Sequence, residues 1–214
     1  KIKRALCAQG AFEGAHYSFF SPSDLNLLGL PEDAPERKAI RLINPINEDL
    51  SLMRTTLAPQ MIHAIARNQK NGCLEGRVYG IGNKFIPKDL PLTEYPDERE
   101  TICIGIWGKE ENFFTLKGLV DTVAETLFID FEYVEDKKTF LHPYRTAKIL
   151  YNGEEIGYLG QLTYEIQKEE DMRESAYIAE IDLKALRPVY GKVPTFAPIS
   201  RFAKETRDLA LVMS

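Results

Sequence analysis

Apolar residues recur at helical spacing in two long segments of the chain. Six of them fall on one face between positions 116 and 127: Leu116, Leu119, Val120, Val123, Ala124 and Leu127. A second helix is predicted over residues 56–72, with a face formed by Ile62, Ile65 and Ala66. Residues 1–9 resemble the end of a further helix, and Ser21 with Asp24 three positions later is a helix-start signal. We expect the two longer helices to lie on a sheet.

Alternation of side chains predicts the strands of that sheet. Between positions 102 and 107, Ile102, Ile104 and Ile106 would point one way and Cys103, Gly105 and Trp107 the other, as in a half-buried strand. Asn152-Gly153 suits a two-residue turn, so residues 146–151 and 154–162 should form an antiparallel hairpin. Further strands are predicted over residues 12–20 and 177–183.

These strands outnumber the long helices and do not alternate with them regularly. This order favours an α+β fold, an antiparallel sheet flanked by helices, over a parallel doubly wound fold. Residues 87–100 hold three prolines and many charges and are predicted to form a solvated loop between strands.

Residues 187–198 contain Pro188, Gly191, Pro194 and Pro198 and indicate a domain boundary. We therefore predict a core domain over residues 1–195. Residues 196–214 are predicted to be a linker and the first strand of a following module, as if the chain were an excised piece of a longer one.

Composition places the chain among ordinary globular proteins. It has 214 residues, 44% of them hydrophobic, and 27 Lys plus Arg against 32 Asp plus Glu, a formal charge of -5. This balance argues against a general nucleic-acid binder, which needs clustered cations. No apolar run approaches the roughly 18 residues of a membrane span, so we expect a cytoplasmic protein. The three cysteines have no metal-ligand spacing and are expected to be buried, inert thiols.

Catalytic motifs are not found in the sequence. Gly80-Ile81-Gly82 begins like a dinucleotide fingerprint, but Phe85 replaces the third glycine and the segment lies in a strand pattern, so tight packing is the favoured interpretation. His142 is the best acid-base candidate, although a turn or capping role is favoured for it. We predict no catalytic, cofactor-binding or metal-ligating residue.

Seven short blocks together resemble the beta subunit of bacterial-type phenylalanyl-tRNA synthetase, in its catalytic-like core. In chain order they are Gly10-Ala-Phe12-Glu13 with Tyr17-Ser18, Asn44-Pro45 with Met53-Arg54-Thr55-Thr56-Leu57 and Pro59, Tyr79-Gly-Ile81-Gly82-Asn-Lys-Phe85, Leu116-Lys117-Gly118, His142-Pro143 with Arg145 and Ala147, Ile156-Gly157-Tyr158-Leu159-Gly160, and Ser200-Arg201-Phe202 with Arg207-Asp208-Leu209-Ala210. The last block is similar to the start of a ferredoxin-like anticodon-binding domain.

The resemblance implies a class II aminoacyl-tRNA synthetase-like fold in an inactive copy. Working class II domains hold ATP with arginines in a Phe-Arg-x-Glu strand motif and a glycine-rich motif, and neither motif is present here. The family implies ATP and magnesium for the whole enzyme, and as partners an alpha subunit, which carries the active site in an assembly of two alpha and two beta chains, and tRNA(Phe). The expected function is non-catalytic: to support alpha-beta assembly and the positioning of tRNA for phenylalanylation.

Four residues are candidate contact residues. Arg54 and Thr55 are predicted at the subunit interface, because a guanidinium can bridge carboxylates or carbonyls there; an intrachain tether is the alternative for Arg54. Arg201 and Arg207 are predicted to contact tRNA, with a solvated charged face as the alternative. Two other functions stay open at this point: a stand-alone acyl-activating enzyme of class II type, and an unrelated protein-interaction domain.

Overall fold

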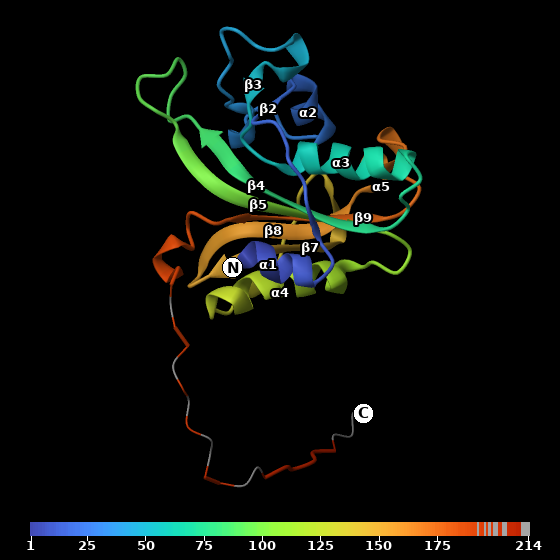
Figure 1. The fold of residues 1–214 in the computed structure, drawn as a ribbon, viewed down its shortest axis with the longest axis vertical. Helices are drawn as coiled ribbons and strands as arrows, with labels where there is room; N and C mark the ends of the chain where they lie inside the picture. Colours follow the sequence, from blue (N-terminus) through green and yellow to red (C-terminus); the bar gives the residue numbers. More distant parts are fainter. Residues whose placement is uncertain (192, 195, 197, 199–200, 203–204, 211–214) are drawn as a thin grey trace.

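A seven-stranded sheet lies at the centre of the protein (Figure 1). The computed structural model describes residues 1–191, 193–194, 196, 198, 201–202 and 205–210. Within this part of the chain the strand order is β1-β4-β5-β9-β8-β7-β6; β1 and β4 are parallel and every other neighbouring pair is antiparallel. The strands are β1 (Phe12–Glu13), β4 (Gly76–Ile86), β5 (Asp97–Trp107), β6 (Glu132–Glu135), β7 (Leu141–Tyr151), β8 (Glu154–Leu162) and β9 (Ala176–Asp182). A separate pair is formed by β2 (Phe19–Phe20) and β3 (Leu52–Met53).

Helices cover both faces of the sheet and produce three layers. α1 (Ile2–Ala8) and α4 (Phe113–Leu127) lie below it in Figure 1, and α2 (Pro22–Leu27), α3 (Ala58–Lys70) and α5 (Tyr164–Glu169) lie above it. Three short 3-10 turns complete the fold: Pro35–Arg37, Glu48–Leu50 and Arg187–Val189. The predicted α+β architecture, an antiparallel sheet flanked by helices, is confirmed.

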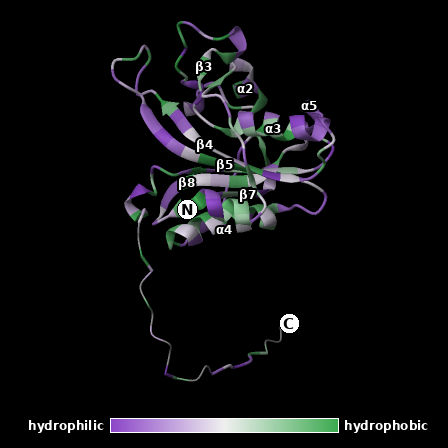
Figure 2. Ribbon diagram, in the orientation of Figure 1, coloured by the Kyte–Doolittle hydropathy of each residue, from purple (hydrophilic) through white to green (hydrophobic). Residues whose placement is uncertain are grey.

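Strand β5 is buried on both faces, so the prediction of a half-buried strand was wrong. Ile102, Ile104 and Ile106 pack in the core formed with α4, whereas Cys103 and Trp107 pack in the core formed with α3. Alternation predicted which side chains share a face, but it does not report a second helical layer. Figure 2 shows the same change along β5, from a hydrophilic outer end to a hydrophobic centre.

Local signals placed the turns and helix starts correctly. Ser21 Oγ accepts a hydrogen bond from the Ser23 backbone N–H at 3.2 Å, and Asp24 accepts one from the Ser21 N–H at 2.8 Å, which completes a capping box. Asn152 and Gly153 have φ values of 52° and 80°, as the predicted hairpin turn between β7 and β8 requires.

Three predicted boundaries were wrong. Residues 12–20 form two short strands, because the chain leaves β4 after Gly14 and pairs through Phe19 with Met53. The loop predicted over residues 87–100 is shorter, because β4 and β5 are a continuous hairpin that pairs Ile86 with Asp97. His142 lies within β7, at a register irregularity, rather than in a loop.

The core ends near Val189, which is buried, and the described residues beyond Gly191 are exposed. Residues 205–210 have no regular secondary structure, and residues 211–214 of the predicted strand lie outside the described residues. The proposed division into residues 1–195 and 196–214 stays a prediction.

Only one of the three cysteines follows the expectation. Cys103 is buried, and burial raises the pKa of its thiol, which keeps it protonated. Cys7 and Cys73 are exposed, because the first lies on the outer side of α1 and the second in the loop that follows α3. In the part of the chain that the structure describes, no helix is long and apolar enough to cross a membrane.

His63 joins three helical segments on the upper face of the sheet. Its Nε2 lies 2.9 Å from Asp24 Oδ1 on α2, and its Nδ1 lies 3.2 Å from Glu170 Oε1, just after α5. Hydrogen bonds to these two carboxylates raise the pKa of His63 to about 9, against the opposing effect of burial. The imidazolium therefore carries its charge at neutral pH and connects α2, α3 and the end of α5.

Stability should fall as this charge is lost. The stabilisation from a raised histidine pKa is complete below the unfolded value of 6.5 and disappears as pH rises through about 9. Thermal unfolding between pH 6 and 9.5 should therefore show a falling midpoint, and the fall should be smaller for His63→Gln. NMR titration of Glu170→Gln should give a lower His63 pKa than the parent chain. Equal pH slopes in parent and His63→Gln would contradict the assignment.

Candidate functional site

A polar cleft of about 600 Å³ opens on the face of the sheet that also carries α3. Its floor comes from β4, β5, β8 and β9, and its walls come from residues 28–36, 55–56 and 137–140. Glu180 and Asp182 enter it from β9, because residues two apart on a strand share a face. The cleft is thus framed by segments distant in the sequence.

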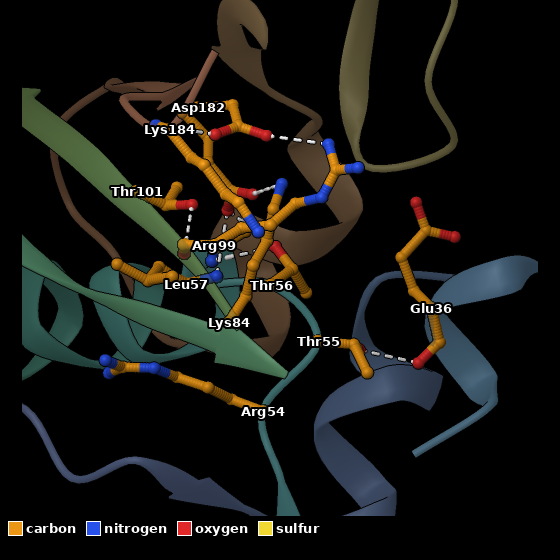
Figure 3. A network of polar contacts seen from close by, with 12 residues as sticks. Glu36, Arg54, Thr55, Thr56, Leu57, Lys84, Arg99, Thr101, Asp182 and Lys184 are labelled. Carbon is orange, nitrogen blue, oxygen red and sulfur yellow. Dashed lines mark hydrogen bonds and ion pairs between the residues drawn. The ribbon is translucent and has the colours of Figure 1, made fainter. Parts of the chain in front are cut away.

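Glu180 is the centre of a buried network in this cleft (Figure 3). The residue is only 4% exposed. Its Oε2 accepts hydrogen bonds from Thr56 Oγ1 at 2.7 Å and from the Leu57 backbone N–H at 2.8 Å, and its Oε1 lies 3.5 Å from Lys84 Nζ. Leu57 is the N-cap residue of α3. The carboxylate therefore satisfies a free N–H at the start of a helix, where a negative charge is favourable.

A second set of ion pairs lies beside it. Arg99 donates from Nη1 to Asp182 Oδ2 at 2.9 Å and from Nε to Asp97 Oδ2 at 2.8 Å, and Lys184 pairs with the other oxygen of Asp97. Hydrogen bonds to Asp97 and Asp182 raise the pKa of Arg99, while those from Lys184 and Arg99 lower the pKa of Asp97. Figure 3 shows these side chains directed toward one another. The Arg99 cation is already committed to carboxylates of the same chain.

The remaining polar groups do not give the cleft a positive charge. Five acidic residues line it, against four basic ones: Asp33, Glu36, Glu155, Glu180 and Asp182 against Lys84, Arg99, Lys137 and Lys138. Lys138 lies 4.9 Å from the centre of the Tyr158 ring and 3.4 Å from Asp136. The Tyr158 hydroxyl is buried and has no hydrogen-bond partner among the described residues. An anion would find few uncommitted donors here.

The structure places Arg54 and Thr55 in different surroundings. Thr55 lines the cleft and donates from Oγ1 to the Glu36 carbonyl at 2.6 Å. Arg54 is 3% exposed; its Nε donates to the Asn83 carbonyl at 2.8 Å, and its Nη1 donates to the Tyr17 carbonyl and to Gln60 Oε1, both at 2.9 Å. These are the contacts of the alternative interpretation, an intrachain tether. The interface role of both residues stays a prediction.

The other candidates do not converge with this cleft. Arg201 and Arg207 are exposed in the C-terminal segment, where Arg207 pairs with Glu205 at 2.8 Å, and their contact with tRNA stays a prediction. His142 accepts a hydrogen bond at Nδ1 from the Tyr144 N–H at 3.2 Å, which is the local role favoured for it. No cluster of three metal-ligating side chains occurs among the described residues.

Sequence reasoning missed the acids and cations of the cleft. A signal was present in residues 176–182, where Glu180 and Asp182 stand at alternate positions of an otherwise apolar segment. Two charges on one face of a buried strand indicate a polar site or paired partners. Their partners, Lys84 and Arg99, lie more than 80 residues away, with sequence separations of 96 and 83, and no local pattern identifies them.

Comparison with known proteins gives the fold and the family. The structure is similar to the crystal structure of pyrrolysyl-tRNA synthetase from Desulfitobacterium hafniense, with a TM-score of 0.69 and 17% identity over 86% of this chain and 65% of that one. A second structure from the same organism, described as PylSc, a pyrrolysyl tRNA synthetase, has a TM-score of 0.67 and 16% identity over 86% of this chain and 64% of that one. The fold is therefore that of class II aminoacyl-tRNA synthetases, as expected.

Sequence relatives agree with one another. The phenylalanine–tRNA ligase beta subunit of Clostridium tetani is 32% identical over 100% of this chain and 27% of its own length, and that of Clostridium acetobutylicum is 31% identical over 97% and 26%. The chain thus spans about a quarter of the length of these relatives. Residues 1–183 match the model of the phenylalanyl tRNA synthetase beta chain CLM domain. On this match, the chain belongs to the phenylalanyl-tRNA synthetase beta chain family.

Proposed function

We propose that this chain is a non-catalytic core module of a cytoplasmic phenylalanine–tRNA ligase. In this role it packs against the alpha subunit, which carries the active site, and helps to position tRNA(Phe) for ATP-dependent phenylalanylation. Family membership supports the proposal, because relatives at about 30% identity are named beta subunits of that ligase. Membership also removes the alternative of an interaction domain unrelated to this family.

The state of the cleft is the observation that carries the non-catalytic role. ATP with magnesium would bring several negative charges, which must be neutralised by cations held in place for them. In the cleft, Arg99 is paired with Asp97 and Asp182, and Lys84 faces Glu180. The buried Glu180 carboxylate would repel a phosphate. The residues present do not fit ATP, and we derive no chemical step from this cleft.

Pyrophosphate exchange tests this proposal against the stand-alone enzyme. Full-length beta subunit containing this module, cognate alpha subunit and their mixture are assayed for phenylalanine-dependent ATP–pyrophosphate exchange and sized by gel filtration. We expect no exchange from beta alone, and a complex with full exchange from the mixture. Exchange by the beta subunit alone would establish the enzyme alternative, and the absence of any complex would refute the assembly role.

Two substitutions in the cleft make the test specific. Tyr158→Phe removes the unpartnered hydroxyl, and Lys137→Ala removes a lining charge. Exchange by complexes carrying either variant should stay within about twofold of the parent complex, because groups that do not contact the reacting atoms leave the activation free energy unchanged. A loss of tenfold or more in either complex would place chemistry in this cleft.

Contact with tRNA is proposed for Arg201 and Arg207. Both side chains are exposed, as phosphate contacts require. In the complete enzyme, the double variant Arg201→Ala/Arg207→Ala should bind tRNA more weakly, and the slope of log K against log salt should fall by about 1 for each phosphate that is no longer neutralised. Lys1→Ala/Lys3→Ala, at the other end of the chain, is the matched control. Unchanged affinity and slope would assign Arg201 and Arg207 to a solvated face.

A further inference from the structure

Arg54 carries a buried charge that no carboxylate of the described chain neutralises. Its three hydrogen bonds go to two backbone carbonyls and one side-chain amide, and none of the ion pairs among the described residues includes it. In Figure 3 the guanidinium points away from the cluster around Lys84, Arg99 and Asp182. Burial lowers the pKa of Arg54, although Glu180 acts on it in the opposite direction from a distance. Buried charges in proteins are ordinarily paired.

The Gly80-Ile81-Gly82 segment explains how Arg54 comes to lie there. Gly80 and Gly82 lie on one face of β4, since they are two residues apart on a strand. A Cβ at Gly82 would lie 2.0 Å from Arg54 Nη2, and a Cβ at Gly80 would lie 2.9 Å from His16 Cδ2. The two missing side chains therefore make room for a guanidinium and an imidazole against the strand. The interpretation of this motif as tight packing is confirmed.

Uncommitted donors face this place. Arg54 Nη2 has no acceptor among the described residues, and the buried Nε2 of His16 has no partner there either. Burial and the nearby Arg54 lower the pKa of His16, so its ring is neutral at pH 7 and can donate one N–H. A guanidinium nitrogen and an imidazole N–H next to each other are suitable donors for a carboxylate.

A cavity of about 440 Å³ opens at these donors. It is lined by residues 13–16, Arg54, Leu57, Gly80 and Ile81, and it shares no lining residue with the cleft around Glu180. Its acidic residue, Glu13, is paired with Lys3 at 2.5 Å and lies 45% exposed at the side chain. Phe12 and Tyr17, at the two ends of this lining segment, are 77% and 65% exposed. The donors thus lie beside exposed aromatic surface.

We propose that this cavity receives an acidic side chain of a partner polypeptide. The carboxylate pairs with Arg54 Nη2 and accepts a hydrogen bond from His16, and apolar residues beside the acid pack on Phe12 and Tyr17. A polypeptide is the occupant because an aromatic rim next to a buried cation fits an acidic side chain with apolar neighbours. The choice of the alpha subunit as the partner to test rests on the proposed function.

Cross-linking in the complete alpha-beta complex identifies the occupant. A photoreactive amino acid replaces Ala15, an exposed residue that lines the cavity. The expected product joins position 15 to a peptide of the partner subunit at or next to an Asp or Glu. A cross-link to tRNA, to a partner peptide without an acid, or to the beta subunit itself, or no cross-link at all, would overturn the proposal.

A carboxylate placed in the cavity gives the second test without removing Arg54. Arg54→Met would remove three structural hydrogen bonds and could unfold the chain for that reason alone, whereas Ala15→Glu keeps them. Ala15→Glu should weaken the alpha-beta complex about tenfold or more and leave the unfolding midpoint of the beta subunit no lower. Ala185→Glu, at an exposed alanine after β9, is the matched control and should bind as the parent does.

The two proposals fail in different ways. If the parent beta subunit forms no complex with the alpha subunit, the proposed function fails. If the parent complex forms and Ala15→Glu binds equally well, only the proposal for the cavity fails.

Discussion

Replacing Glu180 with alanine should lower the free energy of unfolding by about 3–5 kcal/mol, the range expected when one member of a buried charged network is removed. The carboxylate is the acceptor for Thr56 Oγ1 and for the Leu57 N–H, and it faces Lys84 Nζ. All three donors would lose their partner in a site where Glu180 is only 4% exposed. Urea unfolding followed by circular dichroism measures the loss.

Two further variants separate the charge from the hydrogen bonds. Glu180→Gln keeps an acceptor for Thr56 and Leu57 but places an amide opposite Lys84, so its loss should be about 1–2 kcal/mol. Glu125→Ala removes an exposed acid on α4 and should change stability by no more than about 0.5 kcal/mol. If Glu180→Ala were as stable as Glu125→Ala, the network would not anchor the start of α3, and the cleft would be free to rearrange around a ligand.

The same network explains why the cleft could not be predicted from the sequence. The capping box at Ser21 and the turn at Asn152-Gly153 involve neighbours in the chain, so a local pattern was enough to place them. Glu180 meets donors that precede it by 124, 123 and 96 residues. Such pairs exist only after β4, β5 and β9 have aligned, and a single sequence does not show which charges will meet.

Arg54 illustrates the limit from the other side. Its block in the sequence drew attention to it and supported the resemblance to the family, but the block could not say whether the guanidinium faces a carboxylate or carbonyl groups. The structure gives two carbonyls and an amide, and it leaves Nη2 without an acceptor among the described residues. Gly80 and Gly82 acquire a meaning only next to His16 and Arg54, which come from other parts of the chain.

Gly157→Ala is expected to destabilise the sheet by about 3 kcal/mol or more, at the upper end of the effects of overpacking. A Cβ at this position would lie 2.1 Å from the Glu180 carbonyl oxygen and 3.0 Å from Ile181 Cα. These atoms belong to the backbone of β9, which pairs with β8 at Gly157 and Ile181, so no rotamer change can relieve the overlap. The two strands would have to separate, which would also displace Glu180 from the start of α3.

Gly118→Ala is the matched control, because it adds the same methyl group where nothing lies within 4 Å. Gly118 is inside α4, so alanine should raise the free energy of unfolding by about 0.5–1 kcal/mol. Opposite signs for the two substitutions in urea unfolding would show that contact with β9, rather than chain entropy, decides the result at Gly157. If Gly157→Ala lowered the free energy of unfolding by less than about 1 kcal/mol, β8 and β9 would be able to move apart at low cost, and the ion pairs of the cleft would lack the rigid floor on which their geometry depends.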